Sequence, residues 1–309
     1  MRWVTYSSPD AERVGLVVED RVHAVPGVHR LLDLLGDDGT RMAAAADAAT
    51  NDPLEVLELS TVEILAPVPV PPSIRAFMAF EEHVVNSRDR VGATIDPDWY
   101  ELPVFYFTNP AAVHGPGQEV AVPPGCTWFD SELEVAAVVG RGGSDLHPEE
   151  AEAHIAGYTI LCDWSARELQ AREMRQRLGP AKGKDSATSL GPWLVTPDEL
   201  ADRRSGNGFD LRMTATVNGR VYSDGNWSTV YWSFGQLLAY ASRGTTLRPG
   251  DVFGSGTVGR GCILELSGLH GEEEYPWLRP GDEVTLAVER LGELRARIGP
   301  GIGEPVPLR

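Results

Sequence analysis

The sequence predicts a mainly β protein with a few helices, an α+β fold. Short apolar runs typical of strands recur along the chain and are separated by turn residues, with 33 glycines and 23 prolines in 309 residues. Helical periodicity is confined to a few segments, of which the clearest is SARELQAREMRQRL at 165–178. A hydrophobic content of 42% with 23% charged residues is that of an ordinary globular chain. The core is therefore expected to be built mainly from sheets.

Residues 1–70 are predicted to form a small β-rich N-terminal domain. Strand-like runs occur in RWVTYSS, RVGLVVED and RVHAVPG, and an expected helix follows at HRLLDLL. The segment APVPVPPS at 66–73 contains four prolines, which favour an extended connector because each disfavours helix in the residue before it. Residues 71–309 are therefore expected to form a second, larger domain.

The larger domain is expected to consist of short strands with few helices. Strand patterns occur in PVFYF, EVAVP, ELEVAAVVG, AGYTILCD, DLRMTATVNG, DVFGSGTVG, CILELSG and DEVTLAVERLG. Besides the segment 165–178, helical patterns occur in HPEEAEAHIAG and STVYWSFGQLLAYASR.

Charge and cysteine content exclude several classes of protein. Lys and Arg total 27 against 45 Asp and Glu, and the net charge of -18 argues against a nucleic acid or an anionic membrane as partner. Cys126, Cys162 and Cys262 are widely spaced and odd in number, which indicates neither a disulfide framework nor a zinc finger. The sequence has no apolar leader and no apolar run of about 18 to 20 residues. The expected location is therefore the reducing cytoplasm.

The stretch FDSELEVAAVV at 129–139 places three acids on one face of an expected strand. Asp130, Glu132 and Glu134 alternate at the strand period of two, and the same face continues as Ala136 and Val138. Glu132 and Glu134 can converge on one cation because alternate residues lie on the same face of a strand. Two buried like charges also need a counter-charge, which a divalent metal ion would supply. Oxygen ligands favour Mg²⁺, Mn²⁺ or Ca²⁺ over Zn²⁺. The alternative is a solvent-exposed strand face.

A further acid occurs in GYTILCDWSARELQ at 157–170. The run up to Cys162 is expected to be a strand with Asp163 at its end, and Ser165 can cap a helix that carries Arg167 and Gln170. An acid, a cation and an amide would then meet at the end of one strand. The alternative makes Asp163 a helix cap and Arg167 a surface cation.

With these motifs in view, the chain resembles the fumarylacetoacetate hydrolase family over most of residues 75–300. The resemblance is carried by an ordered set of motifs, namely DSELE at 130–134, DWSAR at 163–167, LGPAKGK at 178–184, GPW at 191–193 and SGT at 255–257. It is closest to fumarylacetoacetases in PDWYELPVFY at 97–106, LGPAKGK and GCILELS at 261–267. The resemblance implies a β-sandwich or roll as the catalytic domain, and a homodimer.

The resemblance also implies roles for particular residues. His83 matches the histidine that activates water, and Glu265 matches the carboxylate that orients it. Lys184 matches a position that stabilises charge in catalysis. The ligands of Mg²⁺, or of a similar ion such as Mn²⁺ or Ca²⁺, are matched by Glu132, Glu134 and Asp163. Substrate-binding positions are matched by Tyr106, Arg167, Gln170 and Thr257.

Three positions depart from the family pattern. Fumarylacetoacetases have a further metal-binding aspartate seven residues before the histidine, where this chain has Ala76. The acylpyruvase branch has a glutamate three residues after the histidine, where this chain has Asn86. The arginine that binds the substrate carboxylate has no clear counterpart, and Arg88 and Arg90 are the candidates.

The expected function is hydrolysis of a C–C bond in a small anionic diketo acid similar to fumarylacetoacetate or an acylpyruvate, in aromatic catabolism. His83 with Glu265 behind it is the arrangement of base and orienting acid that deprotonates water near neutral pH. A metal-dependent decarboxylase or tautomerase of a 2-oxo acid would use the same enolate without a hydrolytic water. The third alternative is a catalytically silent metal-binding or ligand-binding protein, which the presence of His83, Glu265 and Lys184 together disfavours.

Overall fold

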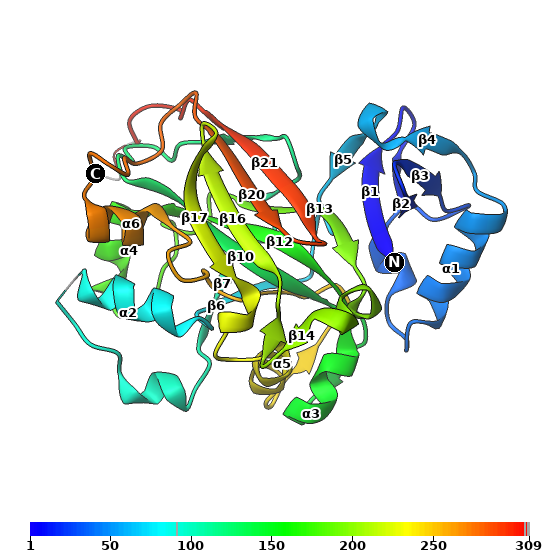
Figure 1. Cartoon of the computed structure of the whole chain (residues 1–309), viewed down its shortest axis with the longest axis horizontal. Helices are drawn as coiled ribbons and strands as arrows, with labels where there is room; N and C mark the ends of the chain where they lie inside the picture. Colours follow the sequence, from blue (N-terminus) through cyan, green and yellow to red (C-terminus); the bar gives the residue numbers. More distant parts are fainter. Residues whose placement is uncertain (91, 306, 308–309) are drawn as a thin grey trace.

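The protein has a mainly β fold with short helices, as the computed structural model of residues 1–90, 92–305 and 307 shows (Figure 1). The α+β class expected from the sequence is confirmed. The α-helices are α1 (Thr40–Asn51), α2 (Glu81–Asp89), α3 (Pro148–Ala151), α4 (Arg167–Met174), α5 (Phe234–Ala241) and α6 (Ile263–His270). The 3-10 helices are η1 (Leu31–Leu34), η2 (Leu59–Thr61), η3 (Pro97–Tyr100), η4 (Glu152–His154), η5 (Pro197–Arg203) and η6 (Trp227–Thr229). Among the residues described, no helix is long and apolar enough to span a bilayer.

A large mixed sheet runs through the whole molecule and comprises twelve strands within the described residues. Its order is β4 (Val56–Glu58), β3 (Arg21–Ala24), β2 (Glu12–Val18), β1 (Arg2–Ser7), β13 (Thr188–Val195), β12 (Ile155–Ala166), β10 (Phe129–Val139), β19 (Val252–Gly254), β6 (Ile74–Phe77) and β7 (Phe105–Thr108). In addition, β5 (Glu63–Leu65) pairs with β1 and β8 (Val113–His114) pairs with β13. The strands of the N-terminal region thus belong to the same sheet as the central strands, through the pairing of β1 with β13.

A second sheet of five strands covers one face of β10 and β12 (Figure 1). Its order is β17 (Arg220–Asn226), β16 (Arg212–Val217), β20 (Glu283–Val288), β21 (Gly292–Gly299) and β9 (Glu119–Ala121). Two small ladders pair β11 (Gly143–Ser144) with β18 (Thr246–Leu247), and β14 (Arg204–Ser205) with β15 (Gly208–Phe209). Val135 of β10 and Ile160 of β12 belong to the same core cluster as Met213 and Leu286 of the second sheet. The two sheets therefore pack as a sandwich.

The opposite face of β10 changes character along its length. Ala136 and Val138 belong to a core cluster that also contains Trp3 and Met42 of the N-terminal region. Glu132, two strand periods before Ala136 on this face, lies outside that cluster, and it contacts Arg167 at the start of α4 and Cys262 directly before α6. The face that carries the acids therefore becomes apolar where the N-terminal region covers it.

The segment CILELSG was expected to be a strand, and this expectation is wrong. Residues Ile263 to His270 form α6. The first free N–H groups of this helix, those of Ile263 and Leu264, donate to the buried carboxylate of Asp130 at 2.7 and 3.0 Å. A carboxylate at the helix start satisfies these groups and interacts favourably with the helix dipole. A long-range contact thus decides the conformation of this apolar segment.

Two other expectations need correction. Ser165 does not cap α4, because β12 continues to Ala166 and the Ser165 hydroxyl donates to the carbonyl of Asp163. The helix expected at HRLLDLL is limited to the single 3-10 turn of η1.

Candidate active site

Three carboxylates meet where β10 and β12 run side by side. Glu132 and Asp163 are directly opposite in the antiparallel ladder, and Glu134 follows on the same face of β10. Carboxylate oxygens of the three residues lie within 4.8 Å of one another, and all three side chains are buried. The structure therefore excludes a solvent-exposed strand face for Glu132 and Glu134, and a helix-capping role for Asp163.

Two buried cations compensate part of this negative charge. Nζ of Lys184 donates to Oδ2 of Asp163 at 3.0 Å and also bonds to Glu132. Arg167, the first residue of α4, donates through Nη2 to Oε1 of Glu132 at 2.6 Å and through Nε to Oδ2 of Asp130 at 2.8 Å. Arg167 is only 5% exposed, so it is not a surface cation.

The pKa values of the three acids diverge because these cations are placed unevenly. Burial alone would raise the pKa of Glu132, but the charges of Arg167 and Lys184 outweigh burial and hold that pKa well below its ordinary value. Burial raises the pKa of Glu134 well above its ordinary value, and the charges of Asp163 and Glu132 raise it further. Burial also raises the pKa of Asp163, which Lys184 opposes only in part. Of the three acids, Glu134 therefore binds a proton most readily when no metal ion is bound.

The carboxylate cluster has the donor atoms that a hard divalent ion requires. Oδ1 of Asp163 is buried and has no hydrogen-bond partner in the part of the chain that the structure describes. The three side chains offer only oxygen donors, which suit Mg²⁺, Mn²⁺ or Ca²⁺. Arg167 also binds Asp130, so the two cations together do not neutralise the acids around them. The residues present therefore fit a bound divalent ion.

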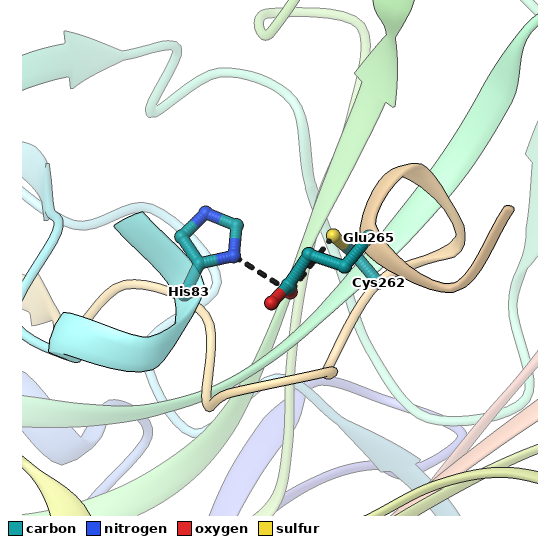
Figure 2. Close-up of side chains that lie close together, drawn as sticks. All are labelled: His83, Cys262 and Glu265. Atoms are coloured by element: carbon teal, nitrogen blue, oxygen red, sulfur yellow. Dashed lines mark hydrogen bonds and ion pairs between the residues drawn. The ribbon is translucent and has the colours of Figure 1, made fainter. Parts of the chain in front are cut away.

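A histidine and a glutamate form a second buried group. His83 lies on α2 and Glu265 lies on α6, and Nδ1 of the histidine is 2.7 Å from Oε2 of the glutamate (Figure 2). Oε1 of Glu265 accepts hydrogen bonds from Nδ2 of Asn86 at 3.0 Å and from the N–H of Arg260 at 2.9 Å. Asn86, one of the departures from the family pattern, thus helps to hold the carboxylate in place.

Electrostatics links His83 to the carboxylate cluster. Burial alone would lower the pKa of His83, but the charge of Glu265 and its hydrogen bond outweigh burial and raise that pKa above its ordinary value. The charge of Glu132 raises it further. The histidine is therefore within electrostatic reach of the carboxylates.

The residues expected to bind substrate surround the same centre. The hydroxyl of Tyr106 donates to Oδ2 of Asp163, and Oε1 of Gln170 accepts from Nη1 of Arg167 at 3.0 Å. Thr257 is buried and directly follows Gly256, whose N–H donates to Oε2 of Glu134 at 2.9 Å. The structure thus brings all the residues expected at the site into one region, and their roles stay predictions.

Gly183 allows Lys184 to reach the carboxylates. A Cβ atom at residue 183 would lie 2.7 Å from the backbone N and Cα of Gln170. Such a distance is too short for real side chains, so the loop that carries Lys184 approaches α4 this closely only with glycine.

Ala76 lies beside the carboxylates. It is paired with Tyr106 of β7 and with Gly254 of β19. Tyr106 reaches Asp163, and a Cβ atom at Gly254 would lie 2.7 Å from Oε2 of Glu134. Because directly paired residues point to the same face of a sheet, the side chain of Ala76 faces the cluster.

The structure does not place Arg88 or Arg90 at the carboxylates. Arg90 pairs with Glu272 at 3.1 Å and lies over the ring of Trp277, and Arg88 is exposed. Arg167 and Lys184 are the cations that the structure brings to the centre.

The role of Asp130 could not be predicted from the sequence. This buried acid accepts from the first N–H groups of α6 and pairs with Arg167 of α4. Its place in the alternation with Glu132 indicated a buried face, but the partners come from segments 37 and 133 residues away. Cys262 was also missed as a neighbour of the site, and its Sγ lies 3.3 Å from Oε2 of Glu265.

The fold and the buried carboxylate cluster belong to a known protein family. Residues 73–299 match the family described as Fumarylacetoacetate (FAA) hydrolase C-terminal. The chain therefore belongs to the fumarylacetoacetate hydrolase family, as the motifs had predicted, and fumarylacetoacetases are among its relatives.

Relatives in this family have different activities. The chain is 33% identical to 2,4-didehydro-3-deoxy-L-rhamnonate hydrolase of Sphingomonas sp. over 222 residues, which cover 71% of this chain and 70% of the relative. It is 31% identical to human mitochondrial oxaloacetate tautomerase FAHD2A over 257 residues, which cover 83% and 76%. The fold also matches maleylpyruvate hydrolase from Sphingobium sp. in complex with manganese and pyruvate, with a TM-score of 0.73, 22% identity, and coverage of 97% and 100%.

Proposed function

We propose that the protein is a divalent-metal-dependent hydrolase that cleaves a C–C bond in a diketo acid similar to fumarylacetoacetate or an acylpyruvate. The observation that carries this proposal is the His83–Glu265 pair, with its 2.7 Å hydrogen bond, within electrostatic reach of the buried carboxylates. The 33% identity to a hydrolase of the same family supports it.

Cleavage between two carbonyl groups generates negative charge at each step. A divalent ion held by Glu132, Glu134 and Asp163 would polarise the carbonyl oxygens and lower the energy of the departing enolate. Nε2 of His83 accepts a proton from water, while Glu265 retains the hydrogen on Nδ1 and so keeps the ring in the required tautomer.

The remaining residues act on the substrate. Lys184 and Arg167, both buried, supply the local positive charge that an anionic diketo acid needs in a chain of net charge -18. Tyr106, Gln170 and Thr257 would orient the substrate from the sides of the centre. We further propose that the protein forms a homodimer, is located in the cytoplasm and acts in aromatic catabolism. We also propose that its two domains divide at residue 70.

Tautomerisation of a 2-oxo acid is the second candidate. It is favoured by the 31% identity to oxaloacetate tautomerase over 83% of this chain. The same centre would then stabilise an enolate, and His83 would move a proton at carbon in place of water. A catalytically silent binding protein would not need a histidine paired with a carboxylate as a general base.

A panel of acylpyruvates, fumarylacetoacetate and oxaloacetate separates these functions. We expect hydrolysis with Mg²⁺ or Mn²⁺ in H₂¹⁸O to give two fragments, with one ¹⁸O atom in the new carboxylate. Deuterium uptake from D₂O at the carbon between the carbonyls, without cleavage, would indicate a tautomerase. His83→Gln should abolish either reaction, and His147→Gln, which changes an exposed histidine, should not.

A further inference from the structure

Three different donor atoms converge beside the carboxylate centre. Oε2 of Glu265 lies 2.7 Å from Nδ1 of His83 and 3.3 Å from Sγ of Cys262 (Figure 2). The donor atoms of these three residues all lie within 4.8 Å of one another, and the side chains are 7%, 3% and 1% exposed for His83, Cys262 and Glu265. An imidazole nitrogen, a thiol sulfur and a carboxylate oxygen are the ligands that Zn²⁺ uses in proteins.

We propose that His83, Cys262 and Glu265 form a second metal site, which binds Zn²⁺ or Cd²⁺ and inhibits the protein when occupied. The donor set of this site differs from that of the carboxylate cluster, because it includes an imidazole nitrogen and a thiol sulfur. The cluster offers oxygen only and suits hard ions, whereas a thiolate and an imidazole favour softer ones. The two neighbouring centres would therefore select different metals.

The three donor atoms lie near the spacing of a zinc site, since all are within 4.8 Å of one another. Tetrahedral Zn²⁺ has bonds of about 2.0 to 2.3 Å, so its ligand atoms lie roughly 3.3 to 3.6 Å apart. The Sγ–Oε2 distance of 3.3 Å already lies at the edge of this range, and the Nδ1–Oε2 distance of 2.7 Å must open by roughly 0.6 Å. Water would supply the fourth ligand, as at zinc sites with three protein ligands.

The hydrogen bonds of Glu265 are divided in a way that permits this exchange. Oε2 accepts the hydrogens of the Cys262 thiol and of Nδ1 of His83, and Oε1 accepts those of Asn86 and of the Arg260 N–H. A metal ion would replace only the hydrogens on Oε2. The partners of Oε1 would keep the carboxylate in place.

Metal binding displaces the hydrogens carried by Sγ of Cys262 and Nδ1 of His83. Burial raises the pKa of the Cys262 thiol, so the free thiol keeps its hydrogen, and metal coordination displaces it to solvent. The hydrogen on Nδ1 of a neutral His83 reappears on Nε2 after exchange with solvent, whereas a cationic ring simply releases one proton. The metal-bound ring therefore carries its hydrogen on Nε2. If His83 is the base of the proposed hydrolase, this ring can no longer accept a proton from water.

Cadmium binding in saturating Mg²⁺ tests the site directly. We expect one Cd²⁺ per chain by equilibrium dialysis, with the ultraviolet absorption of a cadmium–thiolate bond. Cys262→Ser should remove this absorption and weaken binding more than about 100-fold, since even groups behind a metal ligand are worth 10- to 100-fold. Unchanged absorption and affinity in Cys262→Ser would overturn the proposal.

Cys126→Ser provides a matched control. Cys126 also lies against a glutamate, with Sγ 3.4 Å from Oε2 of Glu168, but no histidine completes a cluster there among the described residues. This variant should keep the cadmium site, and loss of the absorption would assign binding to Cys126 instead. His83→Gln supplies a second ligand variant should Cys262→Ser fail to fold, and wild-type affinity in it would contradict the site.

An activity measurement separates this proposal from the proposed function. Inhibition by Zn²⁺ should persist at saturating Mg²⁺ and disappear in Cys262→Ser. Cadmium binding at Cys262 without inhibition would leave the metal site standing and would overturn both its inhibitory effect and the role of His83 as base.

Discussion

Two glutamates two residues apart on β10 have opposite pKa shifts. The charges of Arg167 and Lys184 hold the pKa of Glu132 low despite its burial, whereas burial and the neighbouring acids raise that of Glu134. Position relative to the cations decides the difference, because both side chains are buried. A bound metal ion would displace the proton from Glu134, since a carboxylate must be deprotonated to act as a ligand.

Mg²⁺ affinity should therefore rise with pH. Below its raised pKa Glu134 holds a proton that the ion must displace, so affinity should increase by up to about tenfold per pH unit until that pKa is passed. Calorimetric titrations across pH measure this slope. Glu134→Gln should bind weakly with little dependence on pH, and Glu168→Gln on α4 should behave as wild type. A slope retained in Glu134→Gln would assign the proton elsewhere.

The acidic limb of the activity profile should report His83. A protonated ring cannot accept a proton, so activity falls as pH drops through the pKa of His83, which the charge of Glu265 raises above its ordinary value despite burial. Glu265→Gln removes that negative charge and should shift the midpoint of kcat/KM to lower pH while reducing kcat by about 10-fold or more. A limb that stays in place would show that another group controls it.

The alanine at position 76 should limit metal affinity. Ala76→Asp would add a carboxylate beside Glu134 and Asp163, and a further oxygen ligand should tighten Mg²⁺ binding and change the preference among diketo acids. Mg²⁺ titrations and turnover of diketo acids are compared between the wild type and Ala76→Asp, with Ala76→Asn as the uncharged control. Equal affinity and an identical substrate profile would remove residue 76 from the metal's surroundings.

At the level of elements, one acid connects three parts of the site. Asp130 on β10 accepts from the start of α6, which carries Glu265, and pairs with Arg167 of α4, which binds Glu132. Its side chain is fully buried. The His83–Glu265 pair and the carboxylate cluster therefore depend on the Asp130 carboxylate for their relative position.

Asp130→Ala should destabilise the protein by about 3 kcal/mol or more, because it leaves Arg167 and the start of α6 without a buried partner. Chemical denaturation measures the change in the free energy of unfolding. Asp202→Asn breaks an exposed pair with Arg290 and should leave stability nearly unchanged. Equal stability of both variants would mean that Asp130 is dispensable.

At the level of the whole molecule, the N-terminal region and the larger domain share a sheet and a core. β1 pairs with β13, with Trp3 opposite Leu194. Trp3 also belongs to the same core cluster as Ala136, Leu161 and Val252 of the central strands. Unfolding of either part would expose the core of the other. The two predicted domains are therefore expected to unfold together.

Trp3→Ala should lower the temperature of a single unfolding transition for the whole chain, at a cost of about 3 to 5 kcal/mol, because Trp3 is fully buried. Calorimetry and the thermal loss of Mg²⁺ binding should give the same midpoint. Leu54→Ala, at an exposed residue of the N-terminal region, is the control. Two separate transitions, of which only the first shifts, would establish independent domains.

The sequence by itself determined the fold class, the family and most of the residues that meet at the centre, but not the roles of Asp130 and Cys262. These features rest on local patterns: the alternation in FDSELEVAAVV, the order of short motifs, and the spacing of turn residues. The placement of Glu132 opposite Asp163 agrees with these patterns, because neighbouring strands keep the period of two.

Only the tertiary structure decided which groups contact one another. α6 was mistaken for a strand because its start is held by Asp130 from a distant part of the chain. The opposite pKa shifts of Glu132 and Glu134, and the approach of Cys262 to Glu265, likewise depend on segments far apart in sequence. Burial and charge act through distance in space, which local periodicity does not specify.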